Sequence, residues 1–242
     1  IANQLAGQLM VFSNNMLKAL NPVLVKSRGA GETKKMIEAA ATGNKLSFII
    51  YTFFAIPFMI NCPYILSLWL KNVPEYAVLF VRLVLVRQMI SQLMVTLETC
   101  ISATGRIRNY TISSTAIWLF PILLGYCLYK FNYPIETIYW LLILLVCIRI
   151  VNALVFCKRL FDLKIKDYVK GTLWPCLRIC ILLFVILMLL GYYICSPFMY
   201  LLFSIFVTLI VYPIFAYFGG MNKKERILIN ELLVGLKLFR RK

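Results

Sequence analysis

Seven long apolar stretches, separated by short turns, constrain the fold of this chain more than any other feature. Each has about the 20 residues that a helix needs to cross a hydrocarbon core about 30 Å thick. They are too long for the strands of a membrane barrel and lack the alternation of such strands. The sequence therefore predicts an all-α, polytopic membrane helix bundle of about seven transmembrane helices over residues 1–220. The predicted spans are 1–25, 46–70, 76–104, 110–130, 136–157, 172–195 and 198–218.

The composition excludes several other classes of protein. Hydrophobic residues make up 62% of the 242 residues and charged residues 14%, whereas soluble domains are about 45–50% apolar and about 25% charged. The eight cysteines form no CxxC pair, and the chain has no His to complete a zinc site. We therefore expect no metal and no cofactor.

The basic residues predict how the helices are oriented. Of the 26 Lys and Arg, nineteen follow the first, third, fifth and seventh spans, among them Lys45, whereas Lys71 and Lys130 alone occupy the other loops. Because cytoplasmic loops carry the excess of Lys and Arg, the first span is expected to start outside and the C-terminus to lie in the cytoplasm. This placement accounts for the net charge of +17 without a nucleic-acid partner.

The tail, residues 221–242, is predicted to be a cytoplasmic, basic, amphipathic segment. Apolar residues gather on one helical face and Lys and Arg on the other. This pattern favours a helix lying on the anionic inner leaflet, with a partner-binding helix as the alternative.

Five basic residues fall inside the predicted spans, where a charge is costly unless it faces a cavity or reaches an interface. Arg82 and Arg178 lie near span ends and can extend to the interface. Arg87 and Arg149 lie deeper, and Lys18 is compatible with either position.

A polar stripe surrounds Arg87 on the predicted helix 76–104. At about 100° per residue, Arg87, Ser91, Glu98 and Ser102 share one face, and Gln88, Gln92 and Thr99 extend it. The stripe indicates the wall of a water-filled cavity. The alternative is a polar seam between packed helices.

The first span has a similar design. Gln4, Gln8, Asn15 and Lys18 follow helical spacing, and Asn14 and Asn21 lie beside them. The opposite, lipid-compatible face carries Leu5, Leu9, Phe12, Met16 and Leu20. Two polar-walled helices with mostly positive fixed charge favour an anionic cargo. The candidate substrate-binding residues are Lys18, Arg87, Arg149, Asn14, Asn15, Asn21, Gln88 and Gln92, and Glu98 is the candidate for coupling to H⁺ or Na⁺.

An enzyme is not expected from this portion of sequence. General acid–base catalysis needs a positioned His, carboxylate or similar group, and Glu98 is the one carboxylate well inside a predicted span. No Walker or nucleophile-elbow motif is present.

Three stretches resemble a known family. They are Ala19–Val23 running into Lys26-Ser27, Ile65–Leu70 followed by Val73–Ala77, and Ala103–Ile107 with Tyr110. Together they are similar to Wzx-type polysaccharide exporters of the multidrug/oligosaccharidyl-lipid/polysaccharide exporter superfamily. The match covers about residues 1–120. Because the chain starts at Ile1 rather than Met, we expect it to be the C-terminal portion of such a protein.

The resemblance implies the C-terminal half of a MATE-like transporter with two lobes around a central cavity. It implies a flippase of the bacterial inner membrane that moves undecaprenyl-pyrophosphate-linked oligosaccharide by alternating access, for surface polysaccharide and lipopolysaccharide biosynthesis. The alternatives are a drug/cation antiporter or lipid II flippase of the same superfamily, a membrane-embedded glycan polymerase or acyltransferase, and a membrane scaffold that transports nothing.

Overall fold

The computed structural model describes residues 2–194, 196–222 and 225–226, and in these the chain is a helical bundle without strands. Gly31 (φ +74°) and Gly105 (φ +72°) lie in two of the turns between helices, where glycine adopts positive φ without a steric penalty. The helices are α1 (Ala2–Gly29), α2 (Thr33–Ile60), α3 (Cys62–Trp69), α4 (Ala77–Ser91), α5 (Val95–Ser102), α6 (Arg108–Lys130), α7 (Thr137–Phe161), α8 (Ile165–Tyr168), η1 (Val169–Leu173), α9 (Trp174–Tyr193), α10 (Pro197–Phe215) and η2 (Ala216–Gly220).

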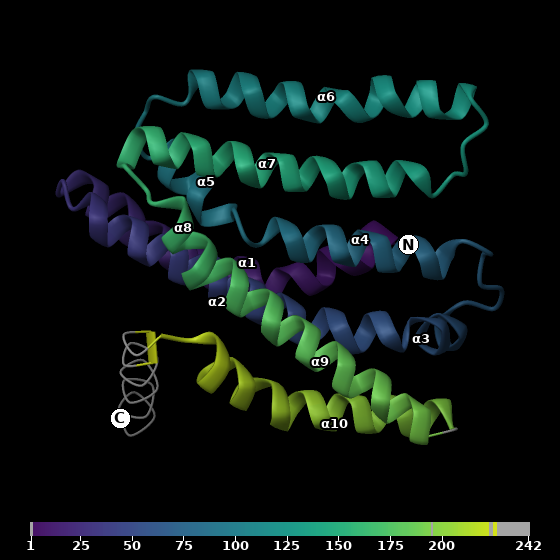
Figure 1. Cartoon of the computed structure of the whole chain (residues 1–242). Coiled ribbons are helices and arrows are strands. Elements are labelled where there is room, and N and C mark those ends of the chain that lie inside the picture. The colour runs from purple at the N-terminus through teal and green to yellow at the C-terminus, as the bar shows by residue number, and fades with distance from the viewer. Residues whose placement is uncertain (1, 195, 223–224, 227–242) are drawn as a thin grey trace.

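The helix α2 lies at the centre of the packing. It contacts α1, α4 and α5 on one side and α9 and α10 on the other. The helix α7 packs on α4 and α5 and carries α6 on its outer face (Figure 1). In the most apolar part of α6 only 6% of the residues are buried, so the remaining surface suits contact with lipid chains.

Five of the described helices are long and apolar enough to cross a membrane, and there are six if the bent pair formed by α4 and α5 is counted as one span. The chain is therefore a helical membrane bundle, as predicted. The predicted count of seven differs because α1, although 28 residues long, does not reach the same apolarity. Its polar side chains lower its hydropathy, and their position is described below.

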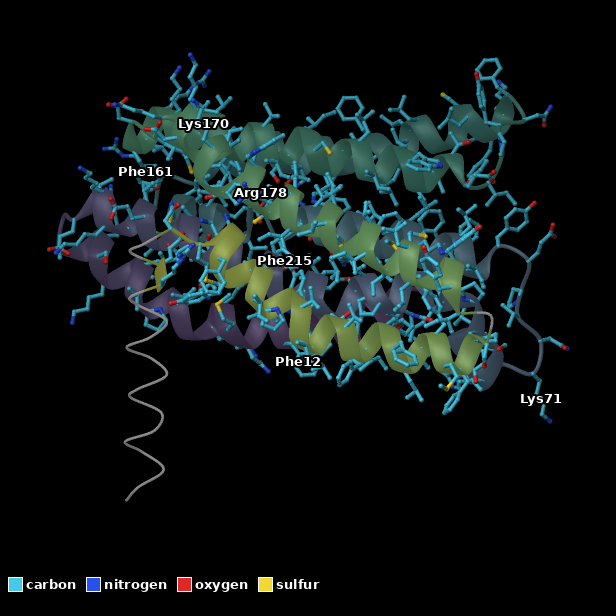
Figure 2. All side chains as sticks on the ribbon, turned by 60° about the horizontal axis from the view of Figure 1, so that its bottom comes forward. Phe12, Lys71, Phe161, Lys170, Arg178 and Phe215 are labelled. Carbon is cyan, nitrogen blue, oxygen red and sulfur yellow. The ribbon has the colours of Figure 1, made fainter. Side chains whose placement is uncertain are left out.

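Successive turns lie at alternate ends of the bundle (Figure 1). The turns after α1, α5 and α7 and the end of η2 share one end, which we call the basic end. Lys26, Arg28 and Arg106 lie at this end, whereas Lys71 and Lys130 flank turns at the other. In Figure 2, Lys71 lies at one end of the bundle, and Phe161 and Lys170 lie at the other end. The alternation that the sequence predicted for these loops is therefore present in the fold.

Two predicted spans are broken in the structure. The stretch 46–70 becomes the second half of α2 followed by α3, with the break at Asn61. The stretch 76–104 becomes α4 and α5, which meet at 45° across residues 92–94. The prediction of one straight helix there was wrong, and with it the assumption that Arg87 and Glu98 share a helical face.

Two placements around α1 and α2 also differ from the prediction. Lys45, expected in a cytoplasmic loop, lies inside α2 with only 1% of its surface exposed. Leu5 and Leu9, assigned from sequence to a lipid-compatible face, pack against the hydrophobic core, whereas Phe12 is 53% exposed and stacks on Phe54. The apolar face of α1 is therefore largely a packing face, and its polar face points out of the bundle.

Gly43 allows α1, α2 and α5 to approach closely. A Cβ atom at this position would lie 2.9 Å from Thr96 Cγ2 and 3.0 Å from Leu20 Cδ1. A real Cβ atom essentially never has a contact of 2.9 Å, and 3.0 Å is tighter than most contacts, so the side chains of Thr96 and Leu20 would have to shift.

We expect Gly43→Val to lower the free energy of unfolding by about 1–3 kcal/mol, because overpacking forces shifts in the surrounding core. Thermal unfolding in detergent measures the loss. Gly7→Val is the matched control, since a Cβ at Gly7 meets nothing within 4 Å. Equal effects of the two substitutions would contradict the close approach.

Candidate functional site

A polar groove of about 310 Å³ lies between α1 and α5. Its α1 wall carries four of the residues predicted from sequence to bind a substrate: Asn14, Asn15, Lys18 and Asn21. Lys18 and Asn15 are exposed, and Asn14 and Asn21 are partly so. The 3.6-residue period of α1 brings these side chains onto one face.

The opposite wall of the groove comes from α5. Val95 and Thr99 line it there, and Val11 and Leu17 of α1 complete the apolar part of the surface. Thr99 belongs to the predicted polar stripe. The groove therefore combines amides, one hydroxyl and one ammonium group, and none of its lining residues is acidic.

A buried polar seam fixes the position of α5. The Asn44 amide of α2 accepts a hydrogen bond from the Thr96 backbone N–H (2.8 Å) and donates one to the Tyr168 hydroxyl (2.9 Å). The Tyr168 hydroxyl in turn donates to the Leu93 carbonyl at 2.5 Å. Because Thr96 N–H lies in the first turn of α5, Asn44 satisfies a backbone donor that the helix itself leaves unpaired.

Gln92 belongs to this seam rather than to the groove. Its side chain is fully buried, and its Oε1 accepts a 2.5 Å hydrogen bond from Ser47. In this conformation Gln92 has no access to a ligand. Its neighbour Gln88 is partly exposed and accepts a hydrogen bond from Ser91 at 3.1 Å.

Glu98 forms a charged cluster that joins α5, α6 and α7. Its Oε1 lies 2.6 Å from Arg149 Nη2 and accepts a 2.8 Å hydrogen bond from the Tyr110 hydroxyl. The Arg149 guanidinium also stands over the Trp118 ring, 5.1 Å from its centroid. The structure thus pairs the predicted coupling carboxylate with one of the predicted substrate-binding arginines.

Two other arginines inside the predicted spans bind helix ends. Arg82 Nε donates to the Met59 carbonyl at 3.1 Å, near the end of α2. Arg178 donates to the Gly219 carbonyl at the end of η2. Carbonyls in the last turn of a helix have no partner within the helix. A cation there also interacts favourably with the negative end of the helix dipole.

Arg87 differs from these arginines. It is partly exposed, and among the described residues it has neither a hydrogen-bond acceptor nor an ion-pair partner. The tyrosines Tyr51 of α2 and Tyr139 of α7 lie near it. It does not line the groove, because the break after Ser91 separates its helix from α5.

The structure therefore brings together the predicted residues of α1 with Thr99, and it places the remaining candidates elsewhere. Sequence reasoning missed Asn44, Tyr110 and Tyr168. Their role depends on partners 12 to 124 residues away in the chain, and no local pattern marks such contacts.

The described cysteines form no disulfide, and no group of His, Cys, Asp or Glu among the described residues is arranged to hold a metal. In comparisons with known proteins, no family model, curated protein or solved structure matches the chain.

Proposed function

We propose that this chain is part of a flippase that moves lipid-linked oligosaccharide across the bacterial inner membrane by alternating access. The observation that carries the proposal is the groove between α1 and α5. It holds a lysine and three asparagines on a helix that packs among apolar, membrane-length helices. Because polar groups at that depth are unfavourable against lipid, their exposed face is best explained by water and a polar cargo.

The chemistry of the groove favours a sugar-phosphate headgroup. Amides and hydroxyls donate and accept hydrogen bonds with sugar hydroxyls, and Lys18 attracts phosphate or acidic sugars. A drug/cation antiporter would need acidic residues in its cavity, and none lines this groove. The groove is near the lower size limit for ligand pockets, so it would hold one portion of a larger headgroup.

Within this proposal the basic end faces the cytoplasm, as does the C-terminus. The excess of Lys and Arg in the turns at that end supports this orientation. Glu98 is the candidate for coupling to H⁺ or Na⁺, with Arg149 as its partner when no ion is bound.

The proposal is tested by flipping of a fluorescent undecaprenyl-pyrophosphate-linked glycan in vesicles that contain the full-length protein. We expect Lys18→Glu to slow flipping about tenfold or more, because it replaces an attractive charge in the groove with a repulsive one. Arg87→Ala is expected to slow flipping while membrane insertion stays normal.

The matched control is Lys71→Glu, which makes the same charge change in a turn at the other end of the bundle. It is expected to leave flipping unchanged. Normal flipping by Lys18→Glu would contradict the proposed function, and normal flipping by Arg87→Ala would leave Arg87 as a packing residue.

A further inference from the structure

A second charged site lies at the basic end, away from the groove. The ammonium group of Lys45 lies 2.8 Å from Glu225 Oε2, and 1% of the Lys45 side chain is exposed against 12% for Glu225. The Thr42 hydroxyl lies 3.4 Å from Glu225 Oε1. These residues are about 180 positions apart in the sequence, so the pair ties the end of the described chain to the central helix α2.

The segment that carries Glu225 is held at several further points. We call it the strap and define it as residues 216–222 with Glu225 and Arg226. The Asn222 backbone N–H donates to Glu225 Oε2 at 2.7 Å, and Arg226 Nη2 donates to the Phe218 carbonyl at 2.7 Å. The Arg226 guanidinium also stands over the Tyr217 and Phe218 rings, 5.3 and 5.5 Å from their centroids.

The strap is packed as closely as it is hydrogen-bonded. A Cβ atom at Gly220 would lie 2.3 Å from Ile179 Cδ1 of α9 and 3.8 Å from Ile49 Cδ1 of α2. Arg178 of α9 donates to the Gly219 carbonyl. The strap therefore bridges α2 and α9 at the basic end.

We propose that the strap is a latch that keeps the basic end closed and that the Lys45–Glu225 pair is its lock. A buried ammonium group is tolerated only while a counter-charge accompanies it. If Glu225 leaves and no other anion replaces it, Lys45 must gain water by opening of the surrounding helices. Release of the strap and opening of the basic end are then one event. This proposal concerns how the bundle opens and holds for any cargo.

Two native cysteines report on this event. Cys176 of α9 is fully buried and lies near both Lys45 and Glu225. Cys62, the first residue of α3, is equally buried, and α3 lies at the other end of the bundle (Figure 1). Labelling by a sulfonated maleimide therefore distinguishes local opening from loss of the whole fold.

The experiment uses two forms of the full-length protein in detergent, one with Cys176 and one with Cys62 as the only cysteine. We expect Glu225→Gln to raise the labelling rate of Cys176 about tenfold or more and that of Cys62 less than about twofold. Lys45→Met combined with Glu225→Met removes the buried charge and is expected to restore protection of Cys176.

Three results would overturn the latch. In the first, Cys176 stays as protected in Glu225→Gln as in the wild type. In the second, Cys176 and Cys62 gain reactivity by the same factor, which would make the pair a contributor to global stability only. In the third, the double variant is as reactive as Glu225→Gln, which would show that the charge pair does not hold the strap.

Discussion

Replacing Glu98 by glutamine is expected to lower the free energy of unfolding by about 2–4 kcal/mol. Glutamine keeps an acceptor for the Tyr110 hydroxyl, so the substitution removes mainly the charge. Arg149, whose side chain is 14% exposed, then loses the carboxylate that lies 2.6 Å away. Neither side chain is fully buried, since Glu98 is 28% exposed. The expected loss of unfolding free energy is therefore smaller than for a fully buried ion pair.

Thermal unfolding in detergent, followed by a thiol-reactive dye, measures this loss because most described cysteines are buried or partly buried. The double variant Glu98→Gln with Arg149→Met is expected to recover most of it, since no unpaired charge remains. Glu32→Gln is the matched control: its pair with Lys35 is at the surface, and the effect is expected within about 0.5 kcal/mol. Simple additivity in the double variant would contradict the coupling.

The second large effect concerns the seam that holds α5. We expect Asn44→Leu to cost about 2–3 kcal/mol, because the buried Thr96 backbone N–H then has no acceptor and the Tyr168 hydroxyl loses a donor. The same unfolding measurement applies.

Asn152→Leu is the control for this substitution. Asn152 donates to Ser113 at 3.0 Å between α7 and α6, but the site is only partly buried. Its loss is expected to stay below about 1 kcal/mol, as for average side-chain hydrogen bonds in membrane bundles. If Asn44→Leu costs no more than Asn152→Leu, then the seam does not position α5.

The predicted helices that match the structure best are those whose apolar runs end at strong local signals. The predicted spans 110–130 and 136–157 correspond to α6 and α7, which are separated by a turn containing Pro134. Pro and Gly favour turns and helix ends through their own backbone preferences, so such boundaries can be predicted from the local sequence. The alternation of basic loops is equally local, since each turn carries its own charges.

The break between α4 and α5 could not be predicted in this way. Residues 91–94 contain neither Gly nor Pro. The break is stabilised instead by Ser47 and Asn44 of α2 and by Tyr168 of α8. Tertiary contacts of this kind override local helix preference. For the same reason the predicted stripe from Arg87 to Ser102 does not form one face.

Lys45 illustrates a similar limit. In the sequence, a lysine at the start of an apolar run indicates the boundary of a span. In the structure, Lys45 is buried because its ammonium group pairs with the carboxylate of Glu225. The α1 wall of the groove was predictable because it depends on the period of one helix. Its partner Thr99 was identified as polar, but its position opposite α1 depends on the 45° bend.

The central claim is that water fills the groove between α1 and α5, and labelling of single cysteines in membranes tests it most directly. Lys18 and Asn15 lie eleven and fourteen residues from the basic-end terminus of α1, and Leu119 and Ile122 lie equally far from that of α6. Each pair therefore lies about 16 and about 21 Å along its own helix from that terminus. Leu119 and Ile122 are 55% and 69% exposed on the apolar outer face of the bundle.

We expect a charged maleimide to label cysteines at positions 18 and 15 at least about tenfold faster than cysteines at 119 and 122, because thiolates form and react in water and not among acyl chains. Equal, slow labelling at all four positions would place the α1 face in lipid or in dry contact, and the proposed transport path would then not exist.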